Sequence, residues 1–209
     1  MKNLFLIDGS GFIFRAFYAL PPLTNPDGIP INAVYGYCNM ILNIYEKFKP
    51  EEVIVVFDTK KKTFRNDIYK DYKSNRIEPP EELIPQFSII RDATDALQIP
   101  RVEIDGYEAD DIIATYTKKA EKEGVSVTIV SSDKDLMQLV NKKTKMYDSM
   151  KNKYIGVKEV KEKFGVGPSK IIDVQALAGD RIDNIPGVSG IGIKTAAELI
   201  NNYNNLENL

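Results

Sequence analysis

Two aspartates stand directly after short apolar runs and are the first candidates for chemistry. Asp8 follows the run Leu4–Ile7, and Asp58 follows the run Val53–Phe57. Taken singly, each is explained at least as well as a turn or helix-capping residue, because aspartate is common at both places. If the two runs are parallel strands, however, both carboxylates lie at the same edge of one sheet, where α/β proteins carry their sites.

A denser group of acids follows in the sequence GYEADD. Glu108, Asp110 and Asp111 fall within four positions at the start of a predicted helix. A helix N-terminus favours negative charge, but the repulsion among three acids exceeds what the helix dipole requires. Glu108 and Asp111 are three residues apart and share one helix face. A functional role is therefore favoured here over a purely structural one.

Two more pairs of acids complete the set. Asp133 and Asp135 follow the apolar run Val125–Val130, where one of them could cap the next helix. Asp180 and Asp183 lie in the helical part of the chain, where a polar turn is the alternative interpretation. Acids gathered at this density raise one another's pKa values and destabilise the fold unless cations neutralise them.

The sequence contains no histidine and a single cysteine, Cys38. This composition excludes imidazole bases, histidine-ligated zinc, serine–histidine triads and an intrachain disulfide. Ligands that are all oxygen suit Mg²⁺ or Mn²⁺ and argue against zinc. Two such ions about 3.5–4 Å apart can activate a water and neutralise the charge on a pentacoordinate phosphate. Phosphodiester hydrolysis is therefore the natural chemistry.

The stretch from Thr59 to Pro80 is basic and aromatic. Its bases are Lys60, Lys61, Lys62, Arg65, Lys70, Lys73 and Arg76, interleaved with Phe64, Tyr69 and Tyr72. A solvated loop explains the lysine run alone. Cations and rings together are typical of a surface that binds phosphates and stacks the bases of a single strand. Because the stretch follows Asp58, we expect it to overhang the carboxylates.

The glycine-rich run Gly187–Gly192 precedes Lys194 and a predicted helix. It follows no strand and lacks the spacing of a dinucleotide fingerprint or a P-loop. A helix-hairpin-helix explains it better, because glycines let backbone amides approach a phosphate of duplex DNA at the next helix N-terminus. A purely structural turn between helices remains the alternative.

Strand and helix patterns alternate along most of the chain. The expected strands are Leu4–Ile7, Val53–Phe57, Arg101–Ile104 and Val125–Val130, and the expected helices between them are Asn32–Phe48, Glu81–Leu97 and Glu108–Glu123. This order predicts an α/β fold with a parallel, doubly wound sheet and helices on both faces. Shorter helices follow at Val157–Phe164, Ser169–Leu177 and Lys194–Tyr203. We therefore expect a core of residues 1–156, with an excursion at about 59–84, and a helical subdomain of residues 157–209.

The 209 residues carry a net charge of −2, which at first argues against a nucleic-acid partner. Once the acids in the motifs above are set aside, the rest of the chain is basic. The apolar run Leu4–Ile7 is too short for a signal peptide or a membrane span, so cytoplasmic residence without a membrane partner is expected.

The motifs together resemble the 5′ nuclease family, in particular the N-terminal 5′–3′ exonuclease domain of bacterial DNA polymerase I and, more distantly, the flap endonucleases. GYEADD at 106–111, SSDKDL at 131–136, YKSNR at 72–76 and GDRIDNIPGVSGIGIKTA at 179–196 are similar to that family's motifs in order and spacing. The resemblance covers essentially the whole chain. It implies a core like that of PIN domains, a helical arch over the site and a monomeric enzyme that trims or cleaves DNA in replication and repair.

The resemblance also implies roles for particular residues. The implied metal ligands, for two or more Mg²⁺ ions that Mn²⁺ can replace, are Asp8, Asp58, Glu108, Asp110, Asp111, Asp133, Asp135, Asp180 and Asp183. Lys73 and Arg76 are implied to contact the scissile phosphate and Tyr72 to stack near the entering strand. The implied DNA-binding set is Phe64, Arg65, Tyr72, Lys73, Arg76, Gly187, Val188, Gly190, Ile191, Gly192, Lys194 and Thr195, with K⁺ at the hairpin.

The expected substrates are DNA with 5′ ends, flaps or nicks, and RNA primers paired with DNA. In this family the helical domain continues beyond the position of Leu209. The resemblance also implies a polymerase domain in the same longer chain. Two alternatives stay open at this point. One is a ribonuclease with a related carboxylate site, which the arch and hairpin make less favoured, and the other is a DNA-binding fragment without activity.

Overall fold

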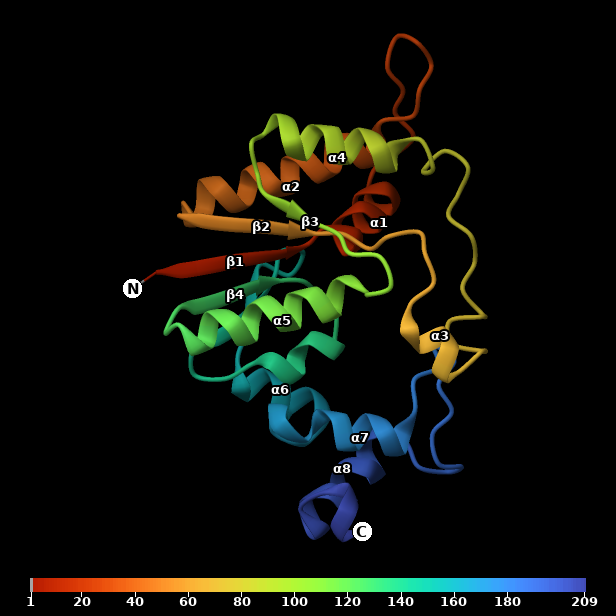
Figure 1. Cartoon of the computed structure of the whole chain (residues 1–209), viewed down its shortest axis with the longest axis vertical. Coiled ribbons are helices and arrows are strands. Elements are labelled where there is room, and N and C mark those ends of the chain that lie inside the picture. The colour runs from red at the N-terminus through yellow and green to blue at the C-terminus, as the bar shows by residue number, and fades with distance from the viewer. Residues whose placement is uncertain (1) are drawn as a thin grey trace.

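A six-stranded sheet forms the centre of the protein, which a computed structural model describes from residue 2 to residue 209 (Figure 1). The strand order is β3-β2-β1-β4-β5-β6. The strands are β1 (Asn3–Asp8), β2 (Glu52–Val56), β3 (Arg101–Val102), β4 (Ser126–Val130), β5 (Thr144–Asp148) and β6 (Lys153–Ile155). All neighbours pair in parallel except β6, which runs antiparallel to β5. The predicted doubly wound α/β sheet is confirmed.

The order of the strands reverses between β1 and β4. The chain builds outward from β1 through β2 to β3 and then crosses back to place β4 on the other side of β1. In the register of these two strands Ile7 lies opposite Val130. Asp8 and Ser131, the next residues of each strand, therefore lie at the crevice where open α/β sheets bind ligands.

Helices cover both faces of the sheet because the strands alternate in side-chain direction. Phe5 and Ile7 pack with α1 (Gly9–Ala19), α2 (Asn32–Phe48) and α4 (Gln86–Ala96). Leu4 and Leu6 lie on the opposite face, which α5 (Ala109–Lys122) covers directly. The helices α6 (Val157–Phe164), α7 (Ile171–Ala178) and α8 (Ile193–Tyr203) continue the same apolar cluster farther from the strands (Figure 1). Across residues 2–209 we find no helix with both the length and the apolar character that a membrane span needs.

The C-terminal helices share the core of the sheet. Val160 of α6, Val174 of α7 and Ile200 of α8 are fully buried, in one apolar cluster with Leu6 and Ile129 of the sheet. Burying these side chains stabilises the packing of the helices. Full burial of one such side chain contributes roughly 1.5–3 kcal/mol, because its apolar surface is removed from water. The division at residue 157 stays a prediction, and the interior is continuous across it.

Several elements differ from the sequence expectations. α1 begins in Asp8-Gly9-Ser10-Gly11, which reads as a turn, yet the Asp8 side chain caps it by accepting from the Gly11 amide. β5 and β6 were not expected, and β3 spans only two residues of the predicted strand Arg101–Ile104. The expected helical arch holds one short helix, α3 (Phe64–Ile68), followed by turns through residue 75.

The remaining short elements are 3₁₀ helices. They are η1 (Asp135–Leu139), η2 (Pro168–Lys170) and η3 (Leu206–Asn208). η1 begins five residues after the last residue of β4 and places Asp135 in its first turn.

Candidate active site

Asp8 lies at the reversal point of the sheet and is almost fully buried. Its Oδ1 accepts from the Gly11 amide at 2.8 Å and its Oδ2 accepts from the Ser131 hydroxyl at 2.8 Å. Burial raises the pKa of Asp8 to about 6, and the nearby charges of Asp58 and Asp133 act in the same direction. Asp8 is thus both a helix cap and an acid whose charged form is destabilised by its surroundings.

Asp58 and Asp110 join this edge from β2 and α5. The Asp58 Oδ1 accepts from the Ala109 amide at 2.7 Å, which places it at the N-terminus of α5. The Asp58 amide donates to the Ser10 hydroxyl at 2.9 Å, which ties the ends of β1 and β2 together. Burial, followed by repulsion from the surrounding aspartates, raises the pKa of Asp110 well above its ordinary value.

Asp133 and Asp135 come from the turn after β4. The Asp133 Oδ1 accepts from the Asp135 amide at 2.8 Å, so the turn holds the two acids at a fixed offset. Asp135 Oδ1 also accepts from the Gln175 side chain of α7 at 2.5 Å. Burial and the charge of Asp133 raise the pKa of Asp135.

These five residues, Asp8, Asp58, Asp110, Asp133 and Asp135, are called the sheet-edge acids below. In the part of the chain that the structure describes, no carboxylate oxygen of these five has a lysine or arginine nitrogen within 4.0 Å. Asp110 is repelled by each of the other four, so the group shares one electrostatic environment. The crowding at one edge that the sequence predicted is therefore present for these five.

The other four expected ligands are held by basic side chains. Arg65 donates to both oxygens of Asp111 at 2.7 and 2.8 Å, and Lys73 Nζ lies 2.7 Å from Glu108 Oε1. Burial would raise the pKa of Asp111, but the hydrogen bonds from Arg65 and the Glu108 amide, together with the charges of Arg65 and Lys73, outweigh it and lower that pKa. These contacts join the basic stretch to the first turn of α5.

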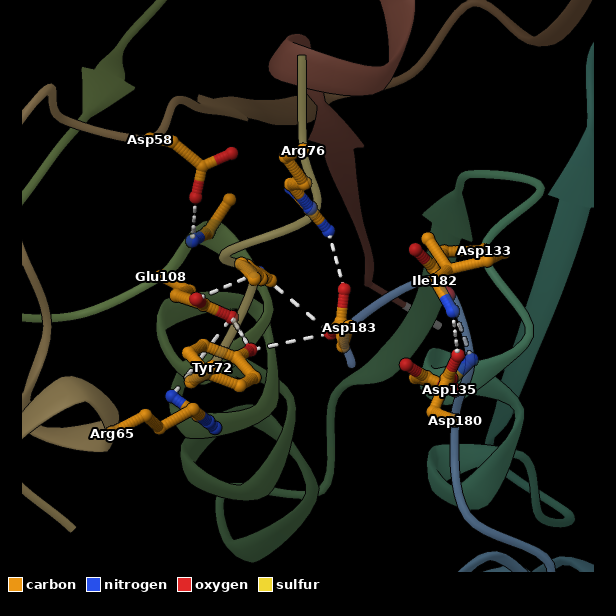
Figure 2. A network of polar contacts seen from close by, with 12 residues as sticks. Asp58, Arg65, Tyr72, Arg76, Glu108, Asp133, Asp135, Asp180, Ile182 and Asp183 are labelled. Atoms are coloured by element: carbon orange, nitrogen blue, oxygen red, sulfur yellow. Dashed lines mark hydrogen bonds and ion pairs between the residues drawn. The ribbon is translucent and has the colours of Figure 1, made fainter. Parts of the chain in front are cut away.

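Asp180 and Asp183 have basic partners as well. Lys134 Nζ lies 2.6 Å from Asp180, and Arg76 Nη2 lies 2.7 Å from Asp183. Burial would raise the pKa of Asp180, but the hydrogen bonds from Lys134 and the Ile182 amide lower it. Figure 2 shows Arg76 and Tyr72 directed at Asp183, with Glu108 beyond Tyr72. Glu108, Asp111, Asp180 and Asp183 are called the bridged acids below.

The basic stretch is docked onto the loop before the glycine hairpin. The Lys73 amide donates to the Asp183 carbonyl at 2.9 Å, and the Asn184 side chain donates to the Asp71 carbonyl at 2.8 Å. Lys73 has a φ of +55°, an uncommon conformation for a residue with a side chain, and this contact helps hold it there. The stretch does overhang the carboxylates, as its position after Asp58 suggests.

The structure corrects the expectation for Tyr72. Its ring is only 6% exposed, and its hydroxyl lies 3.0 Å from Glu108 Oε2 and 3.2 Å from Asp183 Oδ2. A buried ring offers no open face to a base, so stacking by Tyr72 does not fit this arrangement. Phe64 and Tyr69 are the exposed rings of the stretch, at 42% and 36%, and Phe64 packs beside Tyr107 and under Arg65.

The glycine-rich run Gly187–Gly192, called the glycine hairpin, lies between α7 and α8 and is mostly exposed. Gly187 approaches the backbone of Ala178 so closely that an added Cβ would lie 2.3 Å from its carbonyl carbon, so this position needs glycine. Val188, Gly190 and Gly192 are exposed, and Ile191 is half-buried. Gly192 precedes α8, whose first residues include Lys194 and Thr195, and no side chain caps the helix there. Its first amides therefore remain open to a bound anion.

The donor set fits a hard divalent ion, although no three acids or cysteines within residues 2–209 already converge closely enough to hold one. The sheet-edge acids offer only oxygens, and a divalent cation would relieve the repulsion that raises their pKa values. The bridged acids would first have to exchange a basic partner for the ion. Metal binding by all nine acids stays a prediction.

A cavity of about 350 Å³ brings the two groups together. It is lined by sheet-edge acids and bridged acids, by Ser132 and Ile182, and by the bases Lys73, Arg76, Lys134 and Lys163. Sequence reasoning did not single out Lys134, Lys163, Gln175 or Ser131. Lys134 stands inside the SSDKDL motif and could have been found by its place there, whereas the other three carried no local signal.

Known proteins are similar to this chain along its whole length. A family model described as the 5′–3′ exonuclease N-terminal resolvase-like domain matches residues 3–165, and one described as the 5′–3′ exonuclease C-terminal SAM fold matches residues 166–209. DNA polymerase I of Rhizobium leguminosarum is 57% identical over 99% of the chain, which spans 21% of that protein. A 5′–3′ exonuclease of Aquifex aeolicus is 43% identical over 100% of the chain, which spans 72% of it.

A solved structure shows the same fold. The bacteriophage T5 D15 flap endonuclease, in a pseudo-enzyme-product complex with DNA and metal ions, has a TM-score of 0.81 and 26% identity to this chain. The match covers 99% of this chain and 77% of that one. The similarity therefore extends over the sheet, the carboxylate edge and the helices that follow.

Proposed function

Because this chain belongs to the 5′–3′ exonuclease family, we propose that it hydrolyses DNA phosphodiesters at 5′ ends, nicks and flaps in a Mg²⁺-dependent reaction. The observation that carries the proposal is that carboxylates and basic side chains line the same cavity. Asp110, Asp133 and Asp135 line it with Lys73 and Arg76, so oxygen ligands for a cation face side chains that bind phosphate. The T5 enzyme, whose complex contains DNA and metal ions, supports this interpretation.

The sheet-edge acids are the residues that would hold the first divalent ion. A bound Mg²⁺, or Mn²⁺ in its place, supplies a metal-activated water and neutralises charge on the phosphate. The bridged acids Glu108, Asp111, Asp180 and Asp183 are proposed to serve a second ion or its surroundings. Binding a metal ion would require the bridged acids to release a basic side chain. Among the nine expected ligands, only their carboxylates pair with lysine or arginine, namely with Arg65, Lys73, Arg76 and Lys134.

Lys73 and Arg76 are proposed to orient the scissile phosphate. Each now neutralises a carboxylate at 2.7 Å, and a phosphate oxygen is an equivalent anionic acceptor for the same hydrogen bonds. Fixed cations that face the developing negative charge lower the barrier to hydrolysis. Arg65 and the exposed ring of Phe64 would contact the strand that passes beneath the stretch.

The glycine hairpin is proposed to hold the duplex beside the cleavage site. Its exposed glycines and the uncapped start of α8 present backbone amides to phosphates without reading sequence. Lys194 and Thr195 add a charge and a hydroxyl at the same helix start. A monovalent ion such as K⁺ on the carbonyls of this turn would join the turn to a phosphate.

The chain spans about a fifth of the polymerase relative, so the biological setting is also a proposal. We propose that it acts with a DNA polymerase domain in replication and repair, where it removes flaps and RNA primers paired with DNA. The catalytic unit would act as a monomer.

The proposal is tested with a 5′-labelled flap DNA. We expect short labelled products with Mg²⁺ and Mn²⁺, none with a chelator, and weak or no turnover with Ca²⁺, whose looser coordination organises water poorly. Asp110→Asn should abolish cleavage while flap binding in Ca²⁺ is retained. Cleavage by Asp110→Asn at the normal rate, or preferential cutting of an unstructured RNA, would contradict the proposal.

A further inference from the structure

Four basic side chains line the central cavity, and three of them are already matched with acids. Lys73 pairs with Glu108, Arg76 with Asp183 and Lys134 with Asp180, each at 2.6–2.7 Å. The fourth base is Lys163 of α6. Among residues 2–209, no carboxylate oxygen lies within 4.0 Å of its Nζ. Lys163 therefore brings a positive charge to the cavity that the protein does not neutralise by direct contact.

The sequence of α6 explains why Lys163 faces the cavity. Val160 and Phe164 are 0% and 2% exposed and form the buried stripe of this helix. Lys161 and Lys163 are two residues apart, about 200° around an α-helix, and so lie on opposite flanks of that stripe. The Lys161 side chain lies near Gly167 and does not line the cavity, whereas Lys163 lines it with Asp133 and Asp135.

The surroundings of Lys163 favour an additional anion. Partial desolvation in the cavity and the positive charges of Lys151 and Lys134 lower the pKa of Lys163, and the attraction of Asp133 and Asp135 only partly opposes them. An anion that bound between Lys163 and Lys134 would reverse this penalty. The volume of about 350 Å³ lies at the lower end of the range of small-molecule sites, about 300–1,000 Å³.

We propose that Lys163 contacts a backbone phosphate of the bound DNA strand, on the α6 side of the cavity. This proposal rests on the proposed nuclease function. Lys73 and Arg76 approach the cavity from the basic stretch and Lys163 approaches it from α6, so the strand would be held from both sides by charges on different elements. Lys163 would act in binding rather than in the chemical step, because a phosphate away from the scissile bond changes little during hydrolysis.

The test compares Lys163→Gln with Lys161→Gln, because both lysines are exposed on the same helix and both changes remove one charge. Binding of a 5′-flap DNA is measured by fluorescence anisotropy with Ca²⁺, over a series of KCl concentrations. Each phosphate contact contributes about 0.7–0.9 to the slope of log affinity against log salt concentration. We expect Lys163→Gln to reduce the slope by about that amount and to weaken binding several-fold, while Lys161→Gln keeps the wild-type slope.

Two further variants keep the result interpretable. Lys163→Arg preserves the charge and should preserve the slope. Should the glutamine variant fold poorly by circular dichroism, Lys163→Met retains the aliphatic stem, and its slope is compared in the same way. Steady-state kinetics with Mg²⁺ provides a second readout, in which Lys163→Gln should raise KM and leave kcat close to the wild-type value.

The outcomes separate this proposal from the one on which it rests. If the wild-type protein neither binds nor cuts flap DNA, the nuclease proposal fails and this one with it. If the wild-type protein binds DNA but Lys163→Gln and Lys161→Gln have equal slopes, only the role of Lys163 is overturned. A loss of thermal stability in Lys163→Gln with an unchanged slope would mark Lys163 as an internal counter-charge for Asp133 and Asp135, and would also overturn it.

Discussion

The ammonium group of Lys73 lies 2.7 Å from Glu108 and 3.8 Å from Asp183, so a single lysine bridges two carboxylates from distant parts of the chain. Glu108 caps α5, and Asp183 lies in the loop before the glycine hairpin. A divalent cation that used these oxygens would have to compete with Lys73 for them. The basic stretch therefore serves as the counter-charge of the acids that it faces.

This competition predicts the effect of Lys73 on metal affinity. Lys73→Gln should bind Mn²⁺ several-fold more tightly than the wild-type protein, because Glu108 and Asp183 lose a positive partner. Isothermal titration with Mn²⁺ in the absence of DNA measures the effect. Lys70→Gln is the matched control, since it removes the same charge from the same stretch at an exposed position. Equal Mn²⁺ affinities for all three proteins would show that the ion does not use these two oxygens.

The crowding of the sheet-edge acids predicts a gain in stability when one is neutralised. In chelator at pH 7, Asp110→Asn should raise the free energy of unfolding by about 1–2 kcal/mol, because functional sites commonly sacrifice stability. Added Mg²⁺ should stabilise the wild-type protein more than the variant, because stabilisation of the folded state by a ligand grows with the logarithm of the ligand's affinity. Thermal melts with and without Mg²⁺ measure both effects.

Asp92→Asn is the control for this experiment, because Asp92 is an exposed aspartate of α4 and is not one of the sheet-edge acids. If Asp110→Asn melted at or below the wild-type temperature in chelator, repulsion at this edge would not be a significant cost.

The close approach of two backbones predicts which hairpin glycines are structural. Gly187→Ala would bring a Cβ within 2.3 Å of Ala178, so we expect it to cost about 1–3 kcal/mol of stability. Gly192 has a φ of −96° and no heavy atom within 4 Å of an added Cβ, so Gly192→Ala should change stability by less than about 0.5 kcal/mol. Urea unfolding distinguishes the two. Comparable losses in both variants would contradict the described hairpin.

The link between α5 and β5 predicts a pH-dependent contribution to stability. Burial would raise the pKa of Glu121, but hydrogen bonds from Thr144 and Asn141 hold it below the ordinary value of 4.5. A carboxylate with a lowered folded pKa stabilises the protein above its unfolded pKa, and this contribution is lost as the pH falls through the folded value. Glu121→Gln should therefore cost about 1 kcal/mol at pH 7 and progressively less below pH 4.5.

Urea unfolding across this pH range, with and without the substitution, provides the measurement. A difference between wild type and Glu121→Gln that stayed constant down to pH 3 would show that the charge on Glu121 contributes nothing.

Hydrophobic patterns were enough to predict some of the regular elements. The bounds of α2 and α6 agree with the structure, because each helix has a clear apolar stripe that repeats every three or four residues. The strand β4 and its following acids were also placed, because a buried parallel strand is a continuous apolar run. α1 was missed because its first residues include two glycines, and β5 because a lysine interrupts its short run.

The partners of the acids could not be predicted from spacing. Arg76 and Asp183 are 107 residues apart, and only the packing of the basic stretch on the 181–184 loop brings them to 2.7 Å. The same packing buries Tyr72, which looks like an exposed aromatic residue in the sequence. The strand order determines which carboxylates lie together. Long-range packing determines which of them pair with a lysine or arginine side chain.

The continuous apolar interior described above joins the sheet to helices α6, α7 and α8. Within the described chain this cluster runs without a break from the strands to the helices on either side of the glycine hairpin, so close-packed side chains set their separation. A duplex bound at the hairpin would therefore lie at a fixed distance from the sheet-edge acids. That distance would determine which phosphodiester bond is cut.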